Sequence, residues 1–149
     1  MGNRAVVIFK HEKTLSPAVY LHWNGGLESI LAFLQEMDRR KIRGGSNMDY
    51  QVARFIHVCC DFFDLAGATG LSVGTFNAPK SLTPASLKAI CPGDNGVFVI
   101  ERSGTCKITQ YVDGKMFINP ISRLSAADKE VTEGIAKAMA EARPIVKDF

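Results

Sequence analysis

Residues 96–119, GVFVIERSGTCKITQYVDGKMFIN, contain the clearest strand signal of this 149-residue chain. Three β-branched and aromatic runs are separated by the dipeptides Ser103-Gly104 and Asp113-Gly114, which are typical of two-residue hairpin turns. The sequence therefore predicts a three-stranded antiparallel meander. The first turn is predicted to pair residue 102 with 105 and 99 with 108, and the second to pair 112 with 115 and 109 with 118.

This register assigns the side chains of the meander to two faces. The predicted core face carries Val97, Val99, Cys106, Ile108, Val112 and Phe117. The opposite face is also largely apolar, because it carries five large residues, Phe98, Ile100, Tyr111, Met116 and Ile118. Thr109, Arg102 and Lys107 lie on the same face. Such a face has to be covered, either by a helix of the same chain, such as the C-terminal one, or by another chain. These five residues are therefore a candidate interface with a partner protein or in a homodimer.

The rest of the chain predicts a second hairpin and three helices. Residues 4–10 and 17–23 are strand-like runs joined by a polar stretch, and residues 71–76 form a further short strand. Apolar residues recur at helical spacing over 27–42 and 49–66, and a capping box of Ser125 and Asp128 begins a last helix that ends before Pro144. Residues 77–95 are irregular, with one possible helical turn at 86–90.

Together these elements predict a single α+β domain over residues 1–149. Its sheet is expected to be mostly antiparallel, with five to six strands contributed by the N-terminal hairpin and the C-terminal meander, and it is accompanied by three helices. We find no internal repeat, low-complexity segment or linker in the sequence.

Composition excludes several classes of protein. The chain is 46% hydrophobic and 22% charged, as in an ordinary folded domain, and its net charge of +3 is too small to require a nucleic-acid partner. No apolar run approaches the length of a membrane span, and the N-terminus lacks a signal-peptide pattern, so we expect a cytoplasmic protein without membrane contact. The four cysteines have no metal-binding spacing, and neither a metal nor a cofactor is expected.

The most distinctive pentapeptide consists of His22, Trp23, Asn24, Gly25 and Gly26, and it joins a predicted strand to a predicted helix. At such a junction backbone N–H groups can bind an anion. The pattern is neither a P-loop nor a dinucleotide-binding fingerprint, and the acidic residue in the first helical turn, Glu28, would repel a phosphate. The structural interpretation is that Asn24 caps the helix while the glycines form the turn.

Two other polar groups are candidates for a site. Asp94 and Asn95 form a sharp turn before the meander, and this carboxylate would complete a polar pocket if it lay near His22. His57 and Asp61 are four residues apart on a predicted helix, where the pair is either a solvated helix face or an oriented imidazole for acid–base chemistry.

One basic run occurs in the sequence, and it consists of Arg39, Arg40, Lys41 and Arg43. Cations near a helix C-terminus are favoured by the helix dipole, so a solvated helix end explains this run. The alternative is a contact with phosphate or with an acidic partner.

Three stretches, GNRAVV at 2–7, YLHWNGG at 20–26 and DNGVFVI at 94–100, resemble a family of small proteins encoded by bacteriophages, prophages and plasmids. The resemblance covers residues 2–101 and assigns no catalytic residue. It implies a context in which small accessory proteins antagonise host defences, by binding a defence protein or by sequestering its signal.

The expected function is therefore that of a non-catalytic accessory protein of a mobile element. Such a protein binds a host protein complex, as an inhibitor of a host defence system of the anti-CRISPR or anti-restriction type. One alternative is a protein that binds or hydrolyses a nucleotide or signal molecule, with a pocket at residues 22–26 and 94–95 in which Trp23 stacks on a base. A second alternative is binding of RNA or single-stranded DNA through the basic run.

Overall fold

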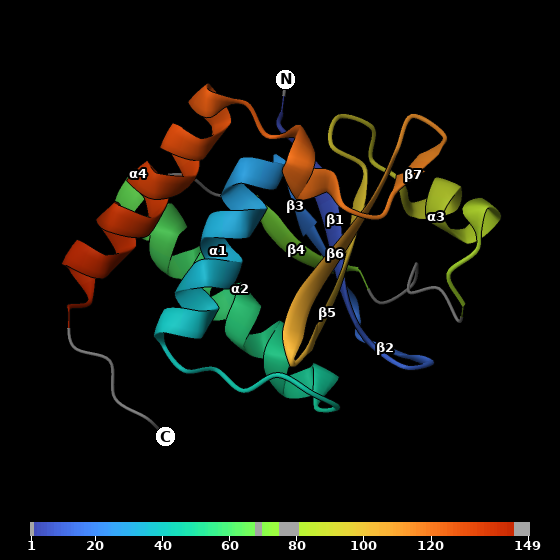
Figure 1. The fold of residues 1–149 in the computed structure, drawn as a ribbon, viewed down its shortest axis with the longest axis horizontal. Helices are drawn as coiled ribbons and strands as arrows, with labels where there is room; N and C mark the ends of the chain where they lie inside the picture. The colour runs from blue at the N-terminus through green and yellow to red at the C-terminus, as the bar shows by residue number, and fades with distance from the viewer. Residues whose placement is uncertain (1, 68–69, 75–80, 145–149) are drawn as a thin grey trace.

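A computed structural model describes residues 2–67, 70–74 and 81–144, and its elements form three layers (Figure 1). The helices α1 (Leu27–Arg39), α2 (Met48–Ala66) and α4 (Ala126–Ala142) cover one face of the sheet, which we call the inner face. The short helix α3 (Pro84–Ile90) lies on the opposite, outer face.

The described residues form a sheet of seven strands. Their bounds are β1 (Ala5–His11), β2 (Thr14–Leu15), β3 (Ala18–Leu21), β4 (Leu71–Gly74), β5 (Val97–Ser103), β6 (Thr105–Val112) and β7 (Lys115–Phe117). The order is β4-β3-β1-β5-β6-β7, and β2 pairs with the end of β1. The N-terminal hairpin and the meander are present as predicted.

The sheet is mixed, because β1 and β5 pair in parallel at its centre, a pair that the sequence analysis did not predict. The other described strand pairs are antiparallel. Parallel neighbours need a long crossover, here the whole segment between residues 11 and 97. No local turn motif marks such a pairing, so the sequence pattern did not reveal it.

The three predicted helices are confirmed within a few residues, and the predicted capping box of Ser125 and Asp128 begins α4. The predicted strand at 71–76 is observed as β4. The described part of the chain does not include its last two predicted residues, 75 and 76, or residues 77–80 of the stretch predicted to be irregular. A fourth α-helix, α3, corrects the prediction of three, and a 3-10 turn, η1 (Pro120–Arg123), precedes α4. None of the helices described is both long and apolar enough to cross a bilayer.

The register of the first meander turn differs from the prediction by one residue. Arg102 pairs with Cys106 and Ser103 with Thr105, so that Gly104 alone, at φ +81°, connects the paired residues. A Ser-Gly dipeptide fits both this turn and a two-residue turn, and the sequence did not distinguish them. The second turn has the predicted register, with Val112 opposite Lys115.

Side chains alternate between the two faces along a strand, so this shift by one residue moves the side chains of β5 to the opposite face relative to those of β6. The inner-face core contains Phe98, Ile100 and Ile108, together with the buried aromatic residues Phe9, Phe33 and Phe55. The outer-face core contains Val6, Ile8, Val97, Val99 and Tyr111, which pack against Leu87 of α3. The chain therefore buries both faces at the centre of its sheet.

Candidate functional site

The three stretches that carry the resemblance meet at one end of the central strands. The backbone N–H of Asn3 donates to the carbonyl of His22 over 2.9 Å, and the N–H of Asn95 donates to the carbonyl of Arg4 over 3.1 Å. Residues predicted as one pocket from distant parts of the sequence thus lie on either side of the start of β1. We call residues 2–4, 20–26 and 94–96 the motif junction.

An ion pair between Arg4 and Asp94 closes one side of the motif junction. The guanidinium Nε lies 2.9 Å from Asp94 Oδ2, which also accepts the Arg4 backbone N–H over 3.0 Å. Hydrogen bonds from the Arg4 side chain and backbone lower the pKa of Asp94 to about 2, and the charge of His22 adds a smaller effect in the same direction. The direct partner of Asp94 is therefore Arg4, which the sequence analysis did not predict.

The other side of the motif junction orients an imidazole. Tyr20 Oη lies 2.9 Å from Nδ1 of His22, and the imidazole ring packs edge-on against Trp23, with 4.9 Å between the ring centroids. Gly2 contacts the imidazole so closely that a Cβ there would lie 2.9 Å from its Nε2. Trp23 is 41% exposed, so its indole ring is accessible to a ligand.

The start of α1 does not have the cap that the sequence predicted. The N-cap residue is Gly26, without a side-chain cap. Asn24 adopts a left-handed conformation, φ +57°, and its Nδ2 donates to Ser29 Oγ over 3.3 Å. The Glu28 carboxylate lies against Gly26, where a Cβ would overlap it. A carboxylate at this position takes up the positive potential of the helix N-terminus and repels a phosphate.

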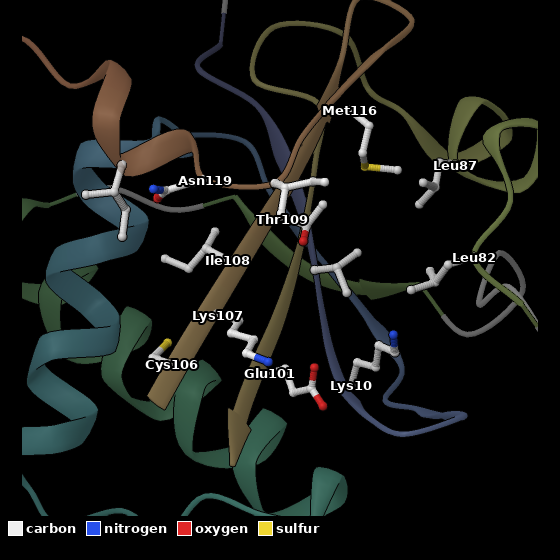
Figure 2. A pocket seen from close by; sticks show the side chains of 13 residues that line it. Lys10, Leu82, Leu87, Glu101, Cys106, Lys107, Ile108, Thr109, Met116 and Asn119 are labelled. Carbon is white, nitrogen blue, oxygen red and sulfur yellow. The ribbon is translucent and has the colours of Figure 1, made fainter. Parts of the chain in front are cut away.

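An apolar groove lies beside the meander (Figure 2). It has a volume of about 430 Å³, and most of its lining lies between the α3 region and the outer side of β5, β6 and β7. It continues around the edge of β6 to Ile108 and Ile121. Apolar lining residues include Leu82, Leu87, Val99, Met116, Ile118 and Ile121. Charged residues line it as well, and these are Lys10, Glu101 and Lys107. We call this feature the α3 groove.

The structure distributes the five predicted interface residues over three environments. Phe98 and Ile100 are fully buried against the inner helices, so the face that contains them is covered by the chain itself. Tyr111 is 7% exposed and packs in the outer-face core. Met116 and Ile118 line the α3 groove and are 45% and 81% exposed. Of the predicted interface, these two residues remain available to a partner.

Sequence reasoning missed the other wall of the groove. Leu82 comes from a stretch that the sequence predicts to be irregular, and Ile121 belongs to η1, which has no apolar periodicity. Leu87 lies in the possible helical turn at 86–90, which is present as part of α3. The one available signal was local: Thr83, Pro84 and Ser86 form a helix start with a capping box.

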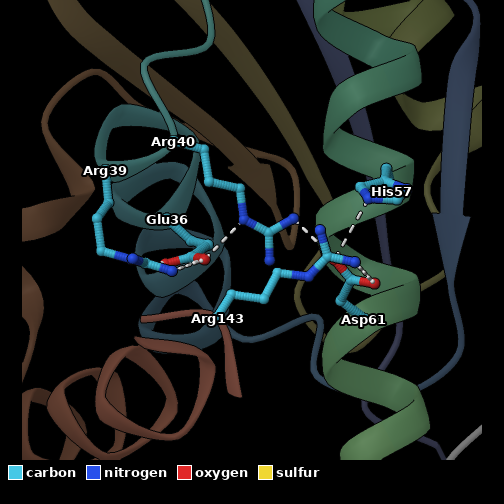
Figure 3. Close-up of polar contacts among 6 residues, drawn as sticks. All are labelled: Glu36, Arg39, Arg40, His57, Asp61 and Arg143. Carbon is cyan, nitrogen blue, oxygen red and sulfur yellow. Dashed lines mark hydrogen bonds and ion pairs between the residues drawn. The ribbon is translucent and has the colours of Figure 1, made fainter. Parts of the chain in front are cut away.

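The basic run is largely engaged within the chain (Figure 3). Glu36 is 2% exposed and accepts hydrogen bonds from Arg39 Nε at 2.6 Å and Arg40 Nε at 2.7 Å. Arg40 also reaches Asp61 at 2.7 Å, and Arg143 contacts the same carboxylate at 3.2 Å. This cluster ties α1 to α2 and to the end of α4, and it reduces the charge that the run offers to a nucleic acid.

The remaining polar candidates are placed as follows. Arg43 lies over the ring of Tyr50, with 5.0 Å between Cζ and the ring centroid. His57 is half exposed and lies 3.4 Å from Asp61, whose carboxylate is shared with two arginines, so this pair belongs to the ion cluster. Within the part of the chain that is described, no group of His, Cys, Asp or Glu is arranged to hold a metal ion.

Comparison with known proteins gives no match of the chain to a family model, to a curated protein or to a solved structure.

Proposed function

We propose that the chain is a non-catalytic binding protein whose α3 groove receives an apolar segment of another protein. The observation that carries this proposal is the exposure of large apolar side chains at the rim of the groove. Ile118 is 81% exposed, Met116 45% and Ile121 37%. Clustered exposed apolar side chains around a cavity are typical of interaction sites, because their burial on binding removes apolar surface from water.

The partner that we propose is a protein complex of a host cell. The resemblance of three stretches to proteins of bacteriophages and plasmids supports this context, in which the protein would act as an inhibitor of a host defence system. The motif junction contributes to this role by fixing the ends of β1, β3 and β5, through the Arg4–Asp94 ion pair and the backbone bonds around it.

Substitution of Ile118 by aspartate tests the proposed surface. We expect Ile118→Asp to reduce recovery of a host complex on the tagged protein at least tenfold, because a charge replaces an anchor that is buried on binding. Val131→Asp is the matched control, since Val131 is 46% exposed on α4, away from the groove. Equal recovery with Ile118→Asp and wild type, or equal loss with both variants, contradicts the proposal. Unchanged thermal unfolding of both variants verifies that the fold is retained.

A second candidate function is binding of a nucleotide at the motif junction, and the exposure of Trp23 beside His22 is the observation that favours it. The Glu28 carboxylate at the start of α1 and the Arg4–Asp94 ion pair oppose it, because they leave little positive potential for phosphate.

Titration of the single tryptophan with nucleotides separates the two functions. We expect no saturable change in the fluorescence of Trp23 on addition of ATP, GTP or cyclic nucleotides at up to millimolar concentration. Saturable quenching that is lost in His22→Ala would instead support the nucleotide site.

A further inference from the structure

One edge of β6 lacks a strand partner along much of its length. β6 pairs with β5 over residues 105–111, whereas β7 pairs only with residues 110–112. No described strand therefore pairs with residues 105–109 on the side away from β5. Thr105, Cys106 and Lys107 are exposed, and Asn119 lies beside the upper end of this edge (Figure 2). An edge of this kind is a template for an added strand.

Two cavities flank the free edge, one on each face of the sheet. The α3 groove opens on the outer face, and a second cavity of about 470 Å³ opens on the inner face beside the tip of the β5–β6 hairpin. The inner cavity is lined by Ile42, Gly44 and the Arg102–Asp38 ion pair, and Cys106 lines both cavities. Because side chains of an added strand alternate between faces, successive residues would enter the two cavities in turn.

Charge distinguishes between a second copy of this chain and a different segment. Antiparallel pairing of the whole of residues 105–109 with the same segment of a second copy places Lys107 directly opposite Lys107, and like charges opposite each other destabilise a strand pair. The α3 groove is also lined by Lys10, Lys107 and Glu101, which together give it an excess of one positive charge. These charges favour an acidic side chain in the added strand.

We propose that the α3 groove and the free edge of β6 bind an extended peptide segment by strand addition. An acidic residue of that segment lies opposite Lys107, and an apolar residue two positions away leaves the edge before the end that Ile118 and Asn119 cover, and fills the groove beside Met116 and Ile118. This proposal rests on the proposed function, because it names the chemistry of the partner segment at the same surface. Backbone hydrogen bonds to the edge supply affinity, and the cavities and Lys107 supply selectivity.

The test uses a displayed library of random ten-residue peptides selected on the purified full-length chain. We expect the selected peptides to share an acidic residue two positions from a large apolar residue. A synthetic copy of one selected peptide should protect backbone amides within residues 105–109 from hydrogen exchange. Binding should weaken at least tenfold in Lys107→Glu, and a new selection on Lys107→Glu should enrich lysine or arginine at the acidic position. Lys129→Glu on α4 carries the same change in net charge and should bind like wild type.

The outcomes separate this inference from the proposed function. Selected peptides that need Ile118 but neither protect residues 105–109 nor respond to Lys107→Glu would overturn strand addition and leave the groove as a binding site. Failure to enrich any peptide, or dimerisation of the chain through this edge, also overturns the inference. The proposed function itself is judged independently, by the effect of Ile118→Asp on recovery of the host complex.

Discussion

Gly96→Ala is expected to lower the free energy of unfolding by about 3 kcal/mol, the sum of roughly 1–2 kcal/mol for a left-handed backbone and a similar cost of overpacking. Gly96 has φ +73°, and a Cβ there would overlap the carbonyl oxygen of Tyr111 and lie 3.0 Å from Val112 Cα. These atoms belong to the backbone of β6, which cannot move without disturbing its pairing with β5. Urea unfolding followed by circular dichroism measures the loss.

Gly104→Ala is the matched control, because Gly104 lies at the other end of β5 with a similar φ of +81° and no atom within 4 Å of the position that a Cβ would occupy. It should cost only about 1 kcal/mol, the conformational part alone. The difference between the two variants isolates the steric contact between Gly96 and Tyr111. Equal losses would mean that the start of β5 relaxes away from β6.

Glu36→Gln is expected to destabilise the fold by about 2–4 kcal/mol, since removal of one member of a buried ion pair leaves the other charge uncompensated. Glu36 is 2% exposed, and the side chain of Arg40, one of its two partners, is 9% exposed. The expected loss of stability is smaller than the largest values for buried ion pairs, because Arg40 keeps its ion pair with Asp61. Glu141→Gln is the control, because its pair with Lys137 is exposed and 4.0 Å long, and it should change stability by less than about 0.5 kcal/mol.

The same carboxylate gives stability a dependence on pH. Burial raises the pKa of Glu36, but hydrogen bonds from Arg39 and Arg40 outweigh burial and bring the pKa below its ordinary value of 4.5. A lowered pKa in the folded state means that the contribution is present above pH 4.5 and is lost as the pH falls toward the folded pKa. Wild type should therefore lose stability on acidification below pH 4.5 more steeply than Glu36→Gln. Parallel pH profiles would contradict this role of Glu36.

Elements with local signals were predictable from the sequence. The capping box at Ser125, the Asp113-Gly114 turn and the apolar spacing of α1 and α2 each depend on neighbouring residues, and each is confirmed. The predicted register of the first meander turn was wrong for a physical reason, because Ser103-Gly104 is compatible with two registers that differ by one residue. That difference placed Phe98 and Ile100 on the wrong face relative to Ile108.

Features that depend on distant residues were not predictable. The partner of Asp94 is Arg4, 90 residues away, and Arg40 reaches Asp61 across 21 residues. The parallel pairing of β1 with β5 and the wall that α3 gives to the groove are also products of tertiary structure. The sequence analysis proposed one pocket for His22, Asp94 and Asn95. Backbone hydrogen bonds from Asn3 to His22 and from Asn95 to Arg4 bring the two segments to either side of the start of β1.

The central position of β1 affects how the chain folds during translation. β1 can pair with β3 as soon as the first hairpin leaves the ribosome, but its other edge pairs with residues 97–100 of β5. A nascent chain that ends before these residues therefore exposes the apolar edge of a half-built sheet. Contacts this distant in sequence slow folding, and exposed strand edges favour aggregation, so the emerging polypeptide is vulnerable until residues 97–100 have been synthesised.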